Sequence, residues 1–278
     1  MVLLRSRRAG FIGLFTQLAS RAMPLTLALL LGACAAAPTR NALASWTPSP
    51  NVGERRAQLI VLHFTGDDSV EHSLRTLRTP NGGNPVSAHY VIGVDGHLYQ
   101  MVADSMRAWH AGVGRWGTIT DLNSASIGIE LDNNGSTPFA PAQINSLLRL
   151  LTDLTGRLRI PRTQIIGHED FAPTRKPDPG ALFPWKQLAD AGFGLWPQGP
   201  LIEPPIGFDP WLALGVVGYP PDNRASVVRA FHDHYRGEQG VGMEGDTLDA
   251  EDLRILYALT RQLSSPPTTP SQPPTSEP

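Results

Sequence analysis

Two histidines stand where buried strands are expected to end. His63 lies near the end of the apolar run "AQLIVLHFT" (57–65), and His168 directly follows "TQIIG" (163–167), with Asp178 a short way beyond. Two imidazoles and one carboxylate, with a fourth position open, are the ligand pattern of a catalytic zinc ion, which makes a water nucleophilic near neutral pH. The alternative is structural, because buried histidines are usually hydrogen-bonded packing residues.

The segment "GHEDFAPTRKPDPG" (167–180) adds Glu169, Asp170 and Lys176 to His168 and Asp178. No helix or strand can run through its three prolines, which are Pro173, Pro177 and Pro179. A solvated turn is the simple explanation of so polar a loop. A stiff loop that aims selected side chains at a site is the functional one.

A mixed order of strands and helices must position these groups. Hydrophobic patterning predicts strands and helices along the chain: strands over 57–65, 126–131 and 163–167, helices near 70–77 and 141–160, and a hairpin over 89–102 with a type I′ turn at Asp95-Gly96. This order argues for an α/β or α+β domain with one central sheet that closes near Trp196. Of the two we expect the α/β fold, with a central mixed β-sheet flanked by helices.

The C-terminal part of the chain has a different composition. Residues 198–209 are predicted to be a linker, and a small three-helix domain is predicted over 210–263, with helices near 210–216, 223–236 and 248–263. Residues 264–278 are rich in Pro, Ser and Thr, which predicts a disordered tail.

The N-terminus indicates export. Residues 1–33 combine four arginines with the apolar run "PLTLALLLGA", as in a secretory signal peptide, and Cys34 follows directly. "LGAC" resembles the bacterial lipobox, which implies lipidation of Cys34, a tether over 34–54 and anchoring to the outer membrane facing the periplasm. A free or buried cysteine is the alternative.

The charge argues against nucleic-acid binding, and the cysteine content argues against disulfides and thiolate metal sites. Removing the four signal-peptide arginines takes the formal net charge from −2 to −6, which leaves no basic footprint for nucleic acid. Cys34 is the only cysteine, so once it is lipidated neither disulfides nor thiolate metal sites are available.

Five segments in order carry a specific resemblance: "VLHFT", "VSAHYVIGVDGHLYQMV", "AWHAG", "SIGIELDN" and "IIGHEDFAPTRKPDPGALFPW". Together they resemble the zinc-dependent N-acetylmuramoyl-L-alanine amidases of the AmpD/AmiD type, which are related in fold to peptidoglycan recognition proteins. The resemblance spans about residues 55–196, and it implies a zinc amidase domain over 55–197. It implies an enzyme that cuts the amide between N-acetylmuramic acid and L-alanine in peptidoglycan or muropeptides.

The resemblance also implies the site. It assigns Zn²⁺ to His63, His168 and Asp178, water activation to Glu130, and oxyanion stabilisation to Lys176. These roles suit amide hydrolysis, which needs a nucleophile, a proton shuttle for the amine and positive charge at the oxyanion. The prolines would hold Asp178 at the metal while Lys176 points at the substrate. Glu169 and Asp170 are then expected near the ligands or in solvent.

Other histidines and one tryptophan have less defined roles. His89, Trp109 and His110 match family positions around the substrate groove, where direct substrate contact and a packing or supporting role both stay open. His72 and His97 are expected at the surface.

The C-terminal segment is similar to the peptidoglycan-binding domain of AmiD-type amidases, with His232 and His234 expected at its surface. A helical cap that only packs against the catalytic domain is the alternative. For the whole protein, the alternatives are a non-catalytic peptidoglycan receptor, which would lack a zinc ligand, and a zinc peptidase, whose motifs the chain does not resemble. We expect a monomer with peptidoglycan and, through its lipid, the membrane as partners.

Overall fold

The computed structural model describes residues 40–54, 57–67, 69–80, 85–240 and 245–264. The predictions of a signal peptide, of lipidation at Cys34 and of a disordered tail fall outside these residues. Within the described part, no helix combines the length and the apolar character that a membrane span requires.

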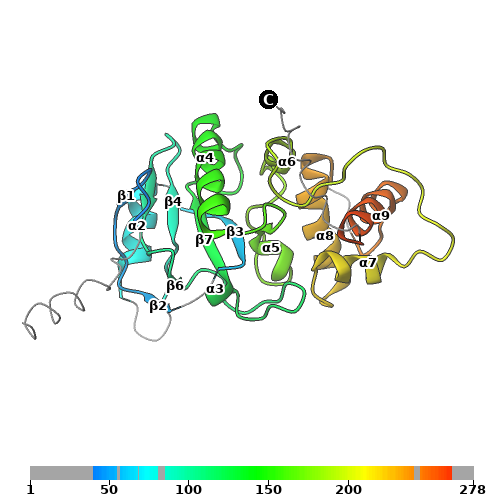
Figure 1. Ribbon diagram of the computed structural model, residues 1–278, viewed down its shortest axis with the longest axis horizontal. Coiled ribbons are helices and arrows are strands. Elements are labelled where there is room, and N and C mark those ends of the chain that lie inside the picture. The colour runs from blue at the N-terminus through cyan, green and yellow to red at the C-terminus, as the bar shows by residue number, and fades with distance from the viewer. Residues whose placement is uncertain (1–39, 55–56, 68, 81–84, 241–244, 265–278) are drawn as a thin grey trace, which may run out of the picture. The chain divides into compact units, whose positions relative to one another are not determined.

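A six-stranded mixed sheet forms the centre of the fold (Figure 1), in the order β1-β5-β4-β7-β3-β8. Strands β4, β7, β3 and β8 run parallel to one another, whereas β5 is antiparallel to β4. The strands are β1 (Ser45–Trp46), β3 (Leu59–Phe64), β4 (Tyr90–Ile92), β5 (Leu98–Gln100), β7 (Ser126–Leu131) and β8 (Ile165–Gly167). The predicted mixed sheet is confirmed.

Strand β3 is buried on both faces, as its continuous apolar run predicts. Ile60 and Leu62 pack with α4 (Pro141–Leu158) on one face, while Leu59 and Val61 point to the other. Helix α4 begins with proline in its first turn and ends at Leu158, and the capping residue Arg159 takes a left-handed conformation (φ 55°). The alternation places His63 on the face opposite α4.

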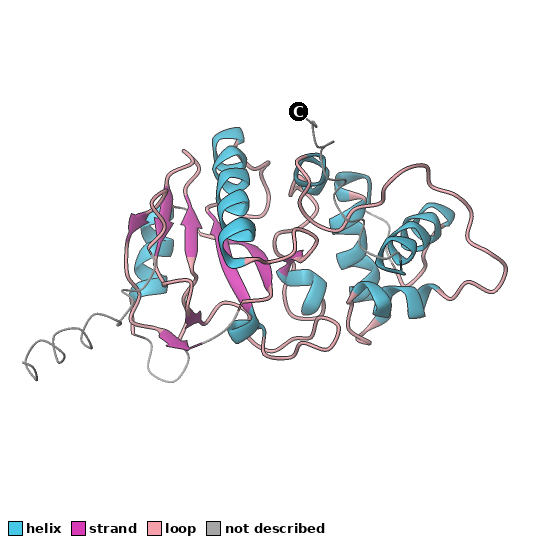
Figure 2. Cartoon of the chain, in the orientation of Figure 1, coloured by secondary structure: helices cyan, strands magenta, loops and turns pink. Residues whose placement is uncertain are grey.

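Helices cover both faces of the sheet, as Figure 2 shows by colour. The remaining helices are α2 (Val70–Arg78), α3 (Leu122–Ala125), α5 (His168–Phe171), α6 (Trp185–Asp190), α7 (Pro210–Val217), α8 (Arg224–Tyr235), η1 (Gly237–Gly240, a 3₁₀ helix) and α9 (Ala250–Ser264). The three predicted C-terminal helices are therefore present as α7, α8 and α9.

The C-terminal helices share a hydrophobic core with the sheet. Leu59 and Val61 of β3 belong to the same buried cluster as Leu214, Phe231 and Leu256, which come from α7, α8 and α9. Helix α5 connects the two parts, since it contacts both β3 and α8.

Two local predictions need correction. The hairpin between β4 and β5 exists, but it has no two-residue type I′ turn. Gly93 accepts a hydrogen bond from the Gly96 amide (2.8 Å) and donates one to the His97 carbonyl (2.9 Å), which leaves a three-residue loop. Only Gly96, at φ 82°, takes the left-handed conformation, whereas a type I′ turn needs Asp95 there as well.

Part of the predicted tether belongs to the fold. Strand β1 pairs with β5, and β2 (Val52–Glu54) pairs with β6 (Met106–Ala108) in a separate two-stranded sheet. The buried Asn41 accounts for the order of this segment, because its backbone amide donates to Gln100 and its side chain donates to Asp153. Polar composition alone could not indicate these long-range bonds.

Candidate active site

His63, His168 and Asp178 converge on one point. His63 Nδ1 lies 2.9 Å from His168 Nδ1 and 2.9 Å from Asp178 Oδ2, and the latter two atoms are 3.1 Å apart. All three side chains are buried. No single proton can satisfy three mutual contacts, since each nitrogen offers one proton or one lone pair. Three ligand atoms aimed at a common point are what a metal ion requires.

The sheet brings the ligands together. His63 lies near the carboxyl end of β3, and His168 follows the carboxyl end of the neighbouring parallel strand β8. In α/β proteins, ligand sites form at the carboxyl ends of the parallel strands. The loop after α5 returns Asp178 to the histidines, because the Glu169 amide donates to the Asp178 carbonyl over 2.9 Å.

Hydrogen bonds on the far side of each ring leave both Nδ1 atoms free to bind a metal. His168 Nε2 donates to the Ala111 carbonyl oxygen at 3.0 Å, an oxygen that Arg175 also contacts. A histidine that donates from one nitrogen keeps a lone pair on the other. His168 therefore presents an unprotonated Nδ1 to the point of convergence.

A chain of donors sets the tautomer of His63 in the same way. The Ser126 hydroxyl donates to the Leu122 carbonyl and lies 3.3 Å from His110 Nε2, which must then donate to it. His110 Nδ1 consequently accepts from His63 Nε2, 3.0 Å away. His63 Nδ1 thus also carries its lone pair toward the metal position.

Glu130 and Lys176 line the same cleft as the three ligands. Glu130 lies on β7 directly beside His63 in the strand register. Lys176 is exposed at the cleft rim, on the proline-rich loop. The cleft has a volume of about 390 Å³ and opens to solvent, so it can take a substrate against the ligands.

The charges of the site shift several pKa values. Burial is the main cause that raises the pKa of Glu130 to about 7, with the Asp178 charge adding to it and His63 and Lys176 opposing it. Burial lowers the pKa of His168 to about 4, with His63 and Arg175 adding to the effect. Burial also opposes the protonation of His63, but Glu130 and Asp178 outweigh it and raise its pKa.

The carboxyl of Asp178 behaves in the opposite way to that of Glu130. Burial works against its ionisation, yet hydrogen bonds from His168 and His63 hold its pKa well below the usual range. A neutral His168 and an ionised Asp178 are the forms that bind a metal. One oxygen of Glu130, moreover, is buried with no hydrogen-bond partner among the described residues. The residues present therefore fit a metal ion with water beside it.

The residues matched to the substrate groove divide into two groups. Trp109 and His110 line the cleft, and the Arg107 guanidinium lies 4.2 Å above the Trp109 ring. His89, in contrast, is fully buried, accepts from the Gly128 amide and donates to the Met106 carbonyl. Substrate contact is thus excluded for His89, and its supporting role is the correct alternative.

Four expectations of surface placement can be checked together. His72 and His97 are exposed, as predicted. The prediction is wrong for His232 and His234, both of which are buried on α8 and paired with carboxylates. Helical periodicity alone did not show which face of α8 would be covered.

Glu169 and Asp170 were expected near the ligands or in solvent, and both are fully buried. Asp170 accepts hydrogen bonds from Tyr219, His234 and the Gly167 amide. The expectation of a solvent position is therefore wrong for both residues. A place near the ligands agrees with the structure, because Asp170 binds the Gly167 amide directly before His168 and the Glu169 amide donates to the Asp178 carbonyl. Two partners of Asp170, Tyr219 and His234, lie far along the chain, where no local pattern points to them.

Gly128 is a site residue that sequence patterning missed. A Cβ atom built on it would lie 2.3 Å from the ring of His110, so only glycine leaves room for that histidine. The available signal was an isolated glycine inside the strand "SIGIEL", which commonly marks the close approach of another group.

The fold and the site together define a class: a hydrolase with a metal-binding group at the carboxyl edge of a mixed sheet. Residues 53–181 match the family model described as N-acetylmuramoyl-L-alanine amidase. The matched range contains the three ligand candidates, Glu130 and Lys176.

Similar proteins agree with this match. The chain is 33% identical over 219 residues to N-acetylmuramoyl-L-alanine amidase AmiD of Escherichia coli (strain K12), covering 73% of each protein. A structure of E. coli AmiD with the substrate anhydro-N-acetylmuramic acid-L-Ala-D-gamma-Glu-L-Lys has a TM-score of 0.63, covering 80% of this chain and 93% of that one. AmpDh3 of Pseudomonas aeruginosa with anhydromuramic pentapeptide has a TM-score of 0.65 at 31% identity, covering 81% and 98%.

The chain therefore belongs to the N-acetylmuramoyl-L-alanine amidase family. Its fold matches that of the AmiD and AmpDh3 structures.

Proposed function

We propose that this protein hydrolyses the amide bond between N-acetylmuramic acid and L-alanine in peptidoglycan or its muropeptide fragments, with one Zn²⁺ held by His63, His168 and Asp178. The observation that carries the proposal is the convergence of these three buried ligand atoms at the wall of an open cleft. Family membership supports the bond that is cut.

A zinc ion in this site would supply a Lewis acid for the scissile carbonyl and would make water nucleophilic near neutral pH. The side chains around it do the rest. Glu130 accepts the proton of the attacking water and delivers it to the departing amine of L-alanine. A pKa of about 7 suits both the uptake of the proton from water and its delivery to the amine, because Glu130 can gain and lose a proton at neutral pH.

Lys176 supplies a second positive charge. It lines the cleft, and its charge lowers the pKa of Glu130 and of His63, so its field reaches the reacting groups. A fixed cation beside the scissile carbonyl stabilises the oxyanion as the carbon becomes tetrahedral. Trp109 and His110 then form part of the cleft wall that holds the substrate.

A muropeptide is the substrate class that the relatives favour. The AmiD and AmpDh3 structures are complexes with anhydro-muropeptides, and the cleft of this protein opens to solvent beside the three ligand candidates. The alternative of a non-catalytic receptor loses support from the complete set of His63, His168, Asp178, Glu130 and Lys176.

The cellular setting is proposed from the sequence. A signal peptide over 1–33 and lipidation of Cys34 would anchor a monomer to the outer membrane, facing the periplasm. Ala35 after the cysteine, in place of Asp, favours that membrane in Gram-negative sorting. Residues 210–263 are proposed to contact peptidoglycan as well.

Mass spectrometry of muropeptides after digestion tests the proposal. We expect free stem peptides that begin with L-alanine and muramic acid without peptide. A chelator should abolish both products, and added zinc should restore them. Binding of muropeptides without cleavage would support the receptor, and cleavage that survives complete zinc removal would overturn the metal assignment.

A further inference from the structure

Asp170 is a fully buried carboxylate two residues after the ligand His168. Its Oδ2 accepts from the Gly167 amide (2.7 Å) and from His234 Nδ1 (2.8 Å), and its Oδ1 accepts from the Tyr219 hydroxyl (2.8 Å). No lysine or arginine is among these three partners. The buried carboxylate thus depends on these three hydrogen bonds, two of which come from the C-terminal part of the chain.

The helix α5, which carries Asp170, is connected to two of the metal-ligand candidates, His168 and Asp178. His168 is its first residue, and Asp170 holds the backbone of Gly167 directly before it. Glu169 brackets the other ligand, because its amide donates to the Asp178 carbonyl and its Oε1 accepts from the Gly180 amide at 3.0 Å. A shift of α5 would therefore move His168 and Asp178 at the same time.

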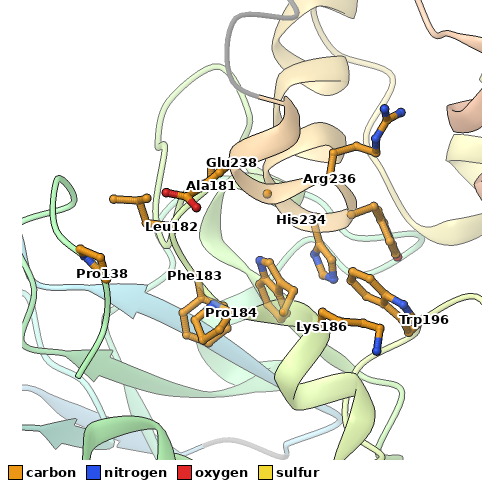
Figure 3. Close-up of a pocket in the computed structure, with 13 residues that line it drawn as sticks. Pro138, Ala181, Leu182, Phe183, Pro184, Lys186, Trp196, His234, Arg236 and Glu238 are labelled. Atoms are coloured by element: carbon orange, nitrogen blue, oxygen red, sulfur yellow. The ribbon is translucent and has the colours of Figure 1, made fainter. Parts of the chain in front are cut away.

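His234 connects this helix to the C-terminal region through a second contact. Its ring stacks on that of Trp185, with centroids 3.8 Å apart and planes inclined by 8°. Figure 3 shows His234 extending from α8 into the space between Pro184 and Trp196. Trp185 begins α6, a few residues beyond Asp178. The imidazole of His234 is thus fixed from both sides.

We propose that His234, with Tyr219, is a positioning residue of the metal centre. The two side chains hold Asp170, and through it the short helix that carries His168 and brackets Asp178. The C-terminal helices are then a structural part of the active site, in addition to any contact they make with the cell wall. This inference rests on the proposed metal site of His63, His168 and Asp178.

The helix α8 offers a matched control. His232 is also buried, and its Nε2 lies 2.9 Å from Asp252 on α9. Replacing either histidine breaks one buried pair between a histidine and an aspartate, but only His234 contacts α5. A second comparison is His234→Asn, whose amide NH₂ can take the place of Nδ1–H, whereas His234→Ala removes the donor.

The experiment measures zinc affinity of the full chain by competition with a chelator. We expect His234→Ala to weaken zinc binding about tenfold, the lower end of the effect of residues that support metal ligands. His234→Asn and His232→Ala should stay near wild type. His234 lines an open cavity of about 410 Å³, so its truncation widens an existing space and should leave the protein folded.

Equal weakening in His234→Ala and His232→Ala would overturn the proposal, because it would indicate a general loss of α8 stability. Unchanged affinity in His234→Ala would overturn it as well. If that variant does not fold, Tyr219→Phe decides, since it removes only one hydroxyl: weaker zinc binding supports the proposal and unchanged binding overturns it. A wild-type protein without zinc affinity would overturn the metal site itself, whereas the other outcomes concern only the positioning role.

Discussion

Glu130 illustrates how single residues acquire chemistry here. The same side chain on an exposed strand would be an ordinary carboxylate, ionised throughout the neutral range. Its place beside His63 in the β3–β7 register and its burial raise its pKa to about 7. The structure thereby provides a proton acceptor matched to the operating pH.

Replacing Glu130 by Gln should abolish turnover while zinc stays bound. The amide fills the same space but cannot accept a proton, so kcat should fall by about 10²–10⁴. Steady-state kinetics and metal analysis of the purified variant check this. Loss of zinc in the variant would instead place Glu130 among the ligands.

The pH dependence should follow the same residue. Glu130 must be ionised to accept a proton, so kcat/KM should fall as pH drops through its pKa, about 7 without metal and lower beside a bound cation. Rate measurements across pH at saturating zinc test this. The residual activity of Glu130→Gln should lack that acid limb, and an unchanged limb would assign it to another group.

At the scale of elements, strand β7 can line the site because one of its residues, Gly128, has no side chain. Gly128 leaves room for the His110 ring, and His110 in turn sets the tautomer of His63. Gly128 and Glu130 are two residues apart on β7, so both lie on the same face of the sheet. The glycine leaves space for the His110 ring, and Glu130 presents its carboxylate beside His63.

Gly128→Ala should therefore damage both stability and metal binding. The added Cβ would overlap the His110 ring, and overpacking of this kind costs roughly 1–3 kcal/mol. Gly156→Ala is the matched control, because that helical glycine has no atoms near its Cβ position and should be neutral or stabilising. Denaturant unfolding and zinc titration of both variants provide the test; wild-type behaviour of Gly128→Ala would contradict the packing argument.

At the scale of the whole molecule, the sheet and the C-terminal helices form one buried cluster. Leu214, Phe231 and Leu256 of α7, α8 and α9 belong to this cluster, and exposure of its apolar side chains would be unfavourable in water. Stability of the catalytic part should consequently depend on residues beyond the matched amidase range.

Phe231→Ala tests this dependence. The side chain is fully buried on α8, and its removal should cost about 3–5 kcal/mol. We expect one shifted unfolding transition, seen equally by circular dichroism and by tryptophan fluorescence. Leu212→Ala on α7 is the control, since that side chain is 68% exposed and should change little. Two separate transitions, with only one displaced, would show that the helices unfold independently.

Cys34→Ser concerns the setting of the whole protein. If the lipid on Cys34 is the anchor, the variant should leave the membrane fraction and keep its amidase activity. Fractionation of cells that express each form is the measurement. Identical soluble behaviour of wild type and variant would refute the lipoprotein proposal, while the amidase assignment would stand on other residues.

Local patterning predicted the long strands and helices and pointed to the two histidine ligands, but it missed the short strands β1, β2 and β6. Apolar runs predicted β3, β7 and β8, and helical spacing predicted α4 and the three C-terminal helices, because burial of one face imposes a short-range period on the sequence. His63 and His168 were recognisable since each stands at the end of such a run. The proline-rich loop similarly indicated why Lys176 and Asp178 lie together.

Tertiary structure alone decided the partners of the remaining polar residues. His110 supports His63, His234 holds Asp170, and His89 joins strands within the core, although all three were open or assigned otherwise from sequence. Histidine is equally compatible with solvent, a core hydrogen bond or a ligand role, so its neighbours determine which applies. Those neighbours lie 47 residues away for His110 and 64 for His234, and only the folded chain brings them within hydrogen-bond distance.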